Sequence, residues 1–419
     1  MNWSMQFPGN VCRIITFLLP LVLWGTSAFG SGYAVYTQGA GALAQGNAVV
    51  AHLDDPSAIF FNPALIGKLP GTQFQAGTTL IHASRKFESD LSGSTFEGEG
   101  DNHFPSTLYV THRFNPRLSA GLGVFSPFGL GTRWDEDWEG RYIATSSELT
   151  TFNINPVVCW QALPGLSLAG GVDLLLLDAT LKKKLALSPL PDGEQRFRGD
   201  GEGLGYNLGL LLDLGESLAL GLHYRSEIDI DIEGEARFSL PAGTPPVISA
   251  MLQNTDGETR ITLPRQAQAG LAFKGVPRLL VEVGARWEDW SDFERLRIDL
   301  DSGLSTTTER DWKDVFGYHL GGRYQLSEDL GLLAGYLYDG TPAPDRTFDP
   351  SIPTAKSQMV SVGVDLDRER YRVQLGYAFQ KYRDRDKDNA VGAAEGGAAN
   401  GTYRTEIHMV GLSLTWRLL

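Results

Sequence analysis

The sequence predicts an all-β protein: a fourteen-stranded antiparallel transmembrane β-barrel plugged by a small N-terminal hatch. Three observations lead to this prediction. Side chains alternate in character along many segments, the connections between those segments alternate between short and long, and no apolar run after residue 30 is long enough for a membrane-spanning helix. A closed barrel also satisfies every backbone amide in lipid, which an open sheet cannot do.

Residues 1–30 have the pattern of a cleaved secretory signal, with an uncleaved membrane anchor as the alternative. Arg13 supplies a positive flank, 14–24 form an apolar run that is short for a bilayer span, and 28–30 offer small residues at cleavage spacing. Cleavage would leave Cys159 as the only cysteine of an exported chain. The fold must then be stabilised without an intramolecular disulfide.

The composition limits the partners and the number of domains. The chain has 419 residues, 49 of them glycine, and a net charge of -14. Because phosphate binding needs a basic surface, we expect no nucleic-acid partner. No linker divides the chain after the signal, so we expect a hatch over 31–71 and a single barrel over 72–419.

Alternation along the chain predicts the strands. In 371–380, aromatic and aliphatic side chains occupy every second position, and polar or small ones occupy the positions between them. The same pattern gives fourteen strands near residues 72–86, 104–114, 117–127, 147–162, 166–186, 202–213, 217–239, 258–274, 278–290, 310–326, 329–339, 354–366, 369–383 and 402–418.

The connections distinguish a membrane barrel from a soluble sandwich. Tight turns are expected at 115–116, 163–165, 215–216, 275–277, 327–328 and 367–368, and long polar connections at 87–103, 128–146, 187–201, 240–257, 291–309, 340–353 and 384–401. Short turns on one rim and long loops on the other, with an even number of strands, are typical of barrels in the outer membrane of Gram-negative bacteria. Both chain termini are then periplasmic.

The interior is apolar in places where a general porin would be polar. The strand around 174–177 carries leucines on both faces, so one face meets lipid and the other meets something apolar. Leu175, Leu177 and Leu211 are candidate pocket residues. Two readings stay open: these leucines line a ligand site, or they pack against a plug, for which 31–71 is the only free segment.

Catalytic, cofactor and metal sites are not expected. The seven histidines have no His-Glu-x-x-His or Gly-x-Ser-x-Gly context, so His223 and His319 are interpreted as polar groups of the lumen. The glycine-rich run 39–44 lacks the preceding strand that a dinucleotide site requires. Acidic residues in 384–395 have calcium-loop spacing but no flanking helices, which favours a solvated outer loop.

Five stretches carry a resemblance to a known family: "SGYAVYTQGAGALAQGNAVVAHLDDPSAIFFNPAL", "GVFSPFGLGTRWDEDWEGRYIATSSELTTFNINP", "YRSEIDIDIEGEARF", "DWKDVFGYHLGGRYQL" and "GYLYDGTPAPDRTFDPSIP". From Ser31 to the C-terminus the chain resembles the FadL/TodX outer-membrane transporters of long-chain fatty acids and other hydrophobic compounds. Two features depart from the family pattern, namely the non-aromatic end "TWRLL" and the short connection 187–201.

The resemblance implies the parts of a gate. The start Ser31-Gly32-Tyr33 and the motif Asn62-Pro63-Ala64 match the family's hatch, and the third strand of the family is kinked inward, which leaves a side opening. Here that opening would involve Ser126, Pro127 and Gly129. Pro127 cannot donate a ladder hydrogen bond, which fits a kink, although an ordinary strand end is the alternative. We expect Asn62 to hold the hatch against the kink.

A fatty-acid carboxylate entering an apolar lumen needs a cation. Strand parity extrapolated from Gly317 and His319 places Lys313 inward near the outer mouth, with Arg310 or Arg141 as possible helpers. The alternative is that Lys313 merely neutralises nearby acids.

These observations predict a channel for gated passive uptake of long-chain fatty acids or similar hydrophobic molecules, with a sideways exit at the kink. We expect the channel to be a monomer surrounded by outer-membrane lipid and lipopolysaccharide. Uptake of aromatic or alkane hydrocarbons by the same route is the alternative. A nonspecific porin and a barrel lipase are the rival classes.

Overall fold

A computed structural model describes residues 32–100 and 102–418. The expected signal over 1–30 and Ser31 therefore lie outside the described residues. Within those residues, no helix is long and apolar enough to cross a bilayer.

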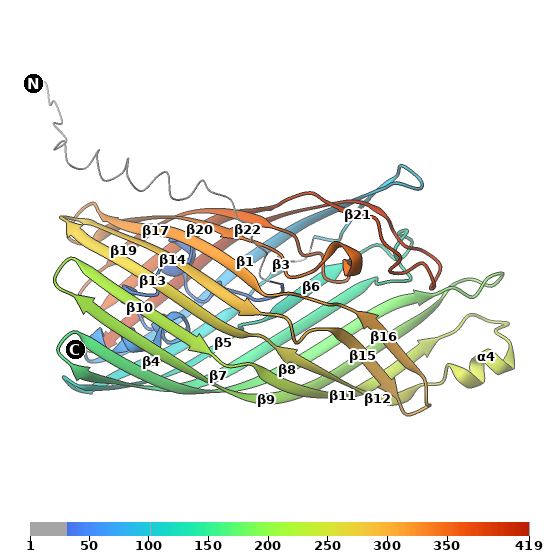
Figure 1. Cartoon of the computed structure of the whole chain (residues 1–419), viewed down its shortest axis with the longest axis horizontal. Helices are drawn as coiled ribbons and strands as arrows, with labels where there is room; N and C mark the ends of the chain where they lie inside the picture. Colours follow the sequence, from blue (N-terminus) through green and yellow to red (C-terminus); the bar gives the residue numbers. More distant parts are fainter. Residues whose placement is uncertain (1–31, 101, 419) are drawn as a thin grey trace, which may run out of the picture.

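The chain folds into a closed antiparallel barrel of fourteen strands, which confirms the predicted fold class (Figure 1). The wall consists of β1 (Thr72–Ser89), β4 (Ser106–Asn115), β5 (Leu118–Phe125) continued by β6 (Gly129–Arg133), β7 (Ser146–Leu163), β8 (Leu166–Leu185), β9 (Gly193–Leu214), β10 (Leu218–Arg225) continued by β11 (Ile228–Ser239), β12 (Thr255–Leu263) continued by β13 (Arg265–Val276), β14 (Leu279–Asp289), β17 (Val315–Gln325), β18 (Leu330–Asp339), β19 (Ser357–Asp367), β20 (Tyr371–Tyr382) and β22 (Gly401–Leu418). Pairing of β1 with β22, from Thr72 opposite Leu418 to Ser89 opposite Gly401, closes the barrel and removes the open sheet edge.

Alternation sorts the side chains between lipid and lumen, as the pattern in the sequence predicted. On β19, Val360, Val362 and Val364 are exposed on the outside, whereas Met359 and Ser361 are buried inside. An outward apolar band is what a bilayer requires.

Turns and long connections occupy opposite ends of the barrel (Figure 1). The long connections contain β2 (Thr95–Glu97), β3 (Asn102–His103), α4 (Pro246–Met251), β15 (Arg295–Leu300), β16 (Ser305–Glu309), η3 (Asp345–Thr347) and β21 (Arg385–Lys387). The expected connection 187–201 is shorter than predicted because β9 begins at Gly193, where it pairs with Leu185 of β8. Because glycine at every second position gives no clear alternation of apolar and polar side chains, the sequence pattern did not indicate this first part of β9.

The N-terminal segment, defined as residues 32–71, lies in the lumen before β1 begins. It contains two short helices, α2 (Ala40–Ala44) and α3 (Ala58–Phe61), and the 3-10 helix η2 (Pro63–Lys68). Most of its apolar side chains form one buried cluster with inward residues of the wall, among them Val157, Cys159 and Leu211. This packing occupies part of the barrel interior.

Candidate transport site

The third strand of the barrel is interrupted. Between the end of β5 at Phe125 and the start of β6 at Gly129, Ser126–Phe128 leave the ladder, although both strands pair with β7. On the opposite side, pairing with β4 ends at Val124. Pro127 lies in the break, where its missing amide hydrogen interrupts the fewest bonds.

The N-terminal segment pairs with the backbone at this break. The Val35 amide donates to the Pro127 carbonyl at 2.8 Å, and the Gly129 amide donates to the Tyr33 carbonyl at 3.0 Å. The Gln38 side-chain amide donates to the Ser126 carbonyl at 2.6 Å. The break is therefore covered from inside by a short strand-like piece of the same chain.

Asn62 does not hold the N-terminal segment against the kink, so that expectation is wrong. Its Nδ2 donates to the carbonyls of Val50 at 2.8 Å and of Leu210 on β9 at 3.0 Å. Its Oδ1 accepts from the Ala64 amide at 3.1 Å. Gly209 permits this approach, because a Cβ there would lie 2.5 Å from Asn62 Oδ1. The motif is thus anchored to β9.

Gln38 contacts the kink instead, and sequence reasoning missed it. Gln38 lies in a run of small residues with no recognised motif, and the one signal available was that it is the only side-chain amide between Gly32 and Ala44. Such an isolated polar group in a buried segment needs a partner.

A second missed residue clamps the N-terminal segment to the opposite wall. Glu282 on β14 is fully buried and accepts hydrogen bonds from the amides of Val50 at 2.6 Å and Ala51 at 2.8 Å. It also bonds His52 Nδ1 at 2.7 Å. A buried carboxylate that binds two backbone amides is a strong attachment.

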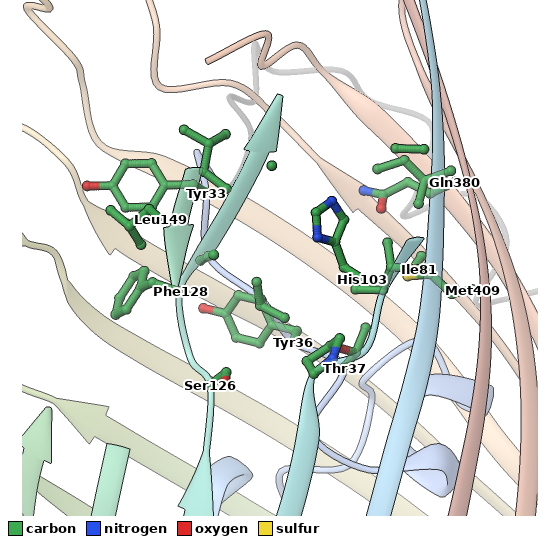
Figure 2. Close-up of a pocket in the computed structure, with 18 of the residues that line it drawn as sticks. Tyr33, Tyr36, Thr37, Ile81, His103, Ser126, Phe128, Leu149, Gln380 and Met409 are labelled. Carbon is green, nitrogen blue, oxygen red and sulfur yellow. The ribbon is translucent and has the colours of Figure 1, made fainter. Parts of the chain in front are cut away.

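A cavity of about 760 Å³ lies between the break and the lumen. Figure 2 shows Tyr33 and Phe128 on one side of this space, and Ile81 and Met409 on the other. Most of the lining is apolar. The lining also includes Phe104, between β3 and β4, whose side chain is exposed.

Charged groups at the inner side of the cavity belong to a network with Tyr36. The Arg286 guanidinium lies 3.8 Å from the centre of the Tyr36 ring, and its Nη2 donates to Asp339 at 2.6 Å. The Tyr36 hydroxyl donates to Glu288 at 2.7 Å. Burial, together with the nearby Glu288 carboxylate, raises the pKa of Tyr36 well above its usual value, which keeps it a neutral donor. Among the described residues, Arg286 Nη1 is buried without a hydrogen-bond partner.

The three candidate leucines are buried but do not line the cavity. Leu211 packs in the apolar cluster of the N-terminal segment, in agreement with the plug reading. Leu175 and Leu177 pack in a second cluster that includes Tyr33 and Phe128.

The expected carboxylate-binding cations also lie outside the cavity lining. The side chain of Lys313 is exposed and does not line the cavity. The inward placement failed because β17 begins only at Val315, and the inward–outward alternation of a strand does not extend beyond its end. Arg310 pairs with Asp349. Arg141 pairs with Asp192 at 2.8 Å.

The acidic loop is held by pairing within the protein. Asp384 binds Arg404 at 3.0 Å, and Asp386 accepts from the Thr402 hydroxyl at 2.7 Å. Across residues 32–100 and 102–418, no group of three or more acidic, histidine or cysteine side chains is arranged to hold a metal ion.

Comparison with known proteins gives matches along almost the whole chain. The family described as "Outer membrane protein transport protein (OMPP1/FadL/TodX)" matches residues 21–418. A long-chain fatty acid transport protein of Escherichia coli O6:H1 is 23% identical, with 82% of this chain and 85% of that protein covered.

Solved structures share the fold. A FadL homologue of Pseudomonas aeruginosa superposes with a TM-score of 0.84 at 19% identity, covering 92% of this chain and 99% of the other. The toluene transporter TodX of P. putida gives 0.73 at 19% identity, covering 92% and 98%.

Proposed function

Because the chain belongs to the outer membrane transport family OMPP1/FadL/TodX, whose members carry hydrophobic compounds, we propose that it is a gated channel for passive uptake of long-chain fatty acids or similar molecules. The observation that carries the proposal is the cavity of about 760 Å³ between the interrupted third strand and the lumen. An apolar cavity with a few convergent polar groups is typical of a lipid-like ligand site.

Arg286 is the residue proposed to meet a carboxylate head group. It lines the cavity, and its Nη1 is free of partners among the described residues. The adjacent Asp339 partly neutralises it, so an acid would bind more weakly than at an isolated cation. The apolar walls would hold the chain of the ligand.

Exit is proposed to occur sideways, through the break at Ser126–Phe128, once Tyr33–Val35 withdraw. Each methylene that stays in an apolar phase contributes about 0.8 kcal/mol, which an aqueous exit would forfeit. The cavity lining supports this route, since Phe104 and Phe152 of the lining are also exposed on the outer face.

The proposed setting is a monomer in outer-membrane lipid and lipopolysaccharide, with both termini periplasmic. The separation of short turns from long connections supports this orientation (Figure 1).

Uptake of labelled oleate by cells expressing the protein tests the route. Deletion of Ser126 should close the break and abolish uptake, while oleate binding and the folded barrel remain. Deletion of Ser302, in the exposed turn between β15 and β16, is the matched control and should leave uptake unchanged. Normal uptake by a variant whose crystal structure shows a continuous third strand would overturn the lateral route.

Planar-bilayer recordings separate this proposal from a nonspecific porin. A barrel filled by residues 32–71 should give no large steady current, whereas an open porin would. Aromatic hydrocarbons remain the second candidate cargo, because aromatic side chains cluster beside the cavity.

A further inference from the structure

A groove of about 670 Å³, here called the rim groove, lies where β18, β19 and β20 approach their long connections. Tyr338, Gln358 and Lys381 lie opposite one another across these three strands and line it. Gln358 is exposed and alternates with Ser357 and Met359, which are buried. The rim groove therefore faces the outside of the barrel.

The rim groove begins where the apolar band of the wall ends. On β19 the exposed valines end at Val360, and the next outward residue toward the long connection is Gln358. On β20, Phe379 lies opposite Val360, and the next outward residue is Lys381. A molecule in the rim groove thus has polar side chains at one end and a lipid-facing apolar surface at the other.

Basic side chains dominate the charge of the rim groove. Lys356, Lys381 and Arg383 line it, and Asp384 is the acidic residue of the lining. The Asp384 carboxylate is already bound by the Arg404 side chain at 3.0 Å. The charge that the rim groove presents is therefore positive.

Two of these cations are available to an external anion. Across the part of the chain that the structure describes, the Arg383 guanidinium has no hydrogen bond or ion pair. Lys381 pairs with Glu406 at 3.0 Å, but both side chains are exposed, and such pairs contribute little to stability. Lys381 and Arg383 are two positions apart on one strand, so their Cα atoms are about 7 Å apart. Both side chains can reach one anionic group.

The edge of the apolar band is not basic all around the barrel. On β9 the outward residue directly beyond the exposed Leu204 is Glu202, which lies opposite Asp231 of β11. The next outward pair toward the long connections is Asp200 and Glu233. An anionic lipid is repelled there and attracted at the rim groove, because the charges differ in sign.

We propose that the rim groove binds a membrane lipid with a phosphorylated head group. Arg383 and Lys381 hold the phosphate, since a guanidinium fork matches two phosphate oxygens and basic pockets at a membrane surface bind phosphorylated head groups. The acyl chains lie along Val360 and the apolar side chains beyond it. In the orientation proposed above this leaflet is the outer one, so the lipid is the lipid A part of lipopolysaccharide. The site is independent of the cargo of the channel.

Binding of fluorescently labelled lipid A, with its phosphates, to the full barrel in detergent tests the site. Lys381→Ala combined with Arg383→Ala should lower the affinity at least tenfold, because the phosphate loses both cations. Arg237→Ala combined with Arg260→Ala removes the same charge from exposed positions on β11 and β12 and should stay within twofold of the wild type. Equal losses in the two double variants would overturn the site, since the attraction would then be general.

Two ligand controls on the wild type separate a lipid from a free anion. Lipid A without its phosphates should bind at least tenfold more weakly than lipid A, and equal affinity refutes the role of the phosphate. Inorganic phosphate at the concentration of the labelled lipid should displace none of it, because it has no acyl chains. Displacement of half of the lipid would show a free-phosphate site and overturn the proposal.

Crosslinking in intact cells separates a specific site from general contact with the surrounding lipid. The photoreactive residue p-benzoylphenylalanine in place of Gln358 should crosslink to lipopolysaccharide at least fivefold more than the same residue in place of Glu202. Both positions follow the apolar band directly, so the control is matched in depth. Equal crosslinking at the two positions would refute a specific site.

Discussion

Replacement of Glu282 by alanine should release the middle of the N-terminal segment from the barrel wall. The fully buried carboxylate accepts from the amides of Val50 and Ala51 at 2.6 and 2.8 Å. Hydrogen bonds to charged groups contribute about 1.5 to 3 kcal/mol each, so the two amides together lose about 3 to 6 kcal/mol of docking free energy. Since about 1.4 kcal/mol is a factor of ten, exposure of this region should rise by roughly 100-fold or more.

Hydrogen exchange of peptides covering 47–55, measured on the folded barrel, would report the change. Glu282→Gln keeps one oxygen acceptor and should give an intermediate effect. Glu258→Ala removes an exposed carboxylate from β12 and should have no effect, which controls for charge. Exchange that is unchanged in Glu282→Ala, or a barrel that unfolds as a whole, would refute the reasoning that this residue clamps the N-terminal segment specifically.

Three further outcomes are expected. Asn62→Ala loses two donated bonds and should weaken docking of the turn on β9 by about 2 kcal/mol; protease cleavage near Ala64 that matches the wild type would contradict this. Gln38→Met removes the bond to the Ser126 carbonyl and should accelerate Val35 amide exchange about fivefold, for a loss of about 1 kcal/mol. Burial opposes ionisation of Asp192, but hydrogen bonds from Arg141 and Tyr142 outweigh it and hold its carboxyl pKa below the usual value. The stability contributed by this lowered pKa is fully present above the carboxyl pKa of the unfolded chain, near 4, and is lost as the pH falls through the pKa of the folded protein. Because Asp192→Asn removes the titrating group, it should flatten the acidic side of a plot of melting temperature against pH.

The wall of the barrel could be predicted from sequence because its signal is local. Alternation within 371–380 or 402–418 depends only on residues within one strand, and turn lengths fix which strands are neighbours. The attachments of the N-terminal segment, in contrast, join residues that are far apart in the sequence. Whether Asn62 meets β9 or the kink depends on how a separately folded piece sits inside the lumen, and no short-range pattern encodes that.

Lys313 shows a second limit of prediction from the sequence. Its inward placement was extrapolated from Gly317, but the periodicity of a strand has no meaning beyond the last paired residue, and β17 begins at Val315. Glu282 and Arg286 escaped notice for a related reason. Charged residues at inward positions of a barrel strand are ordinary for a water-filled lumen. The N-terminal segment supplies the amides that Glu282 binds and the Tyr36 ring that packs against Arg286.

The interrupted third strand has a consequence for the permeability barrier of the cell envelope. A pore wide enough for a bulky molecule normally admits water-soluble toxins and antibiotics as well, because it joins two aqueous compartments. The proposed opening past Phe104 would instead join an aqueous compartment to the apolar interior of the bilayer. Because Glu282 and Asn62 attach residues 40–71 inside the lumen, the proposed lateral opening would not require the axial path to open. Under this proposal, uptake of hydrophobic nutrients would not lower the resistance of the cell to polar compounds.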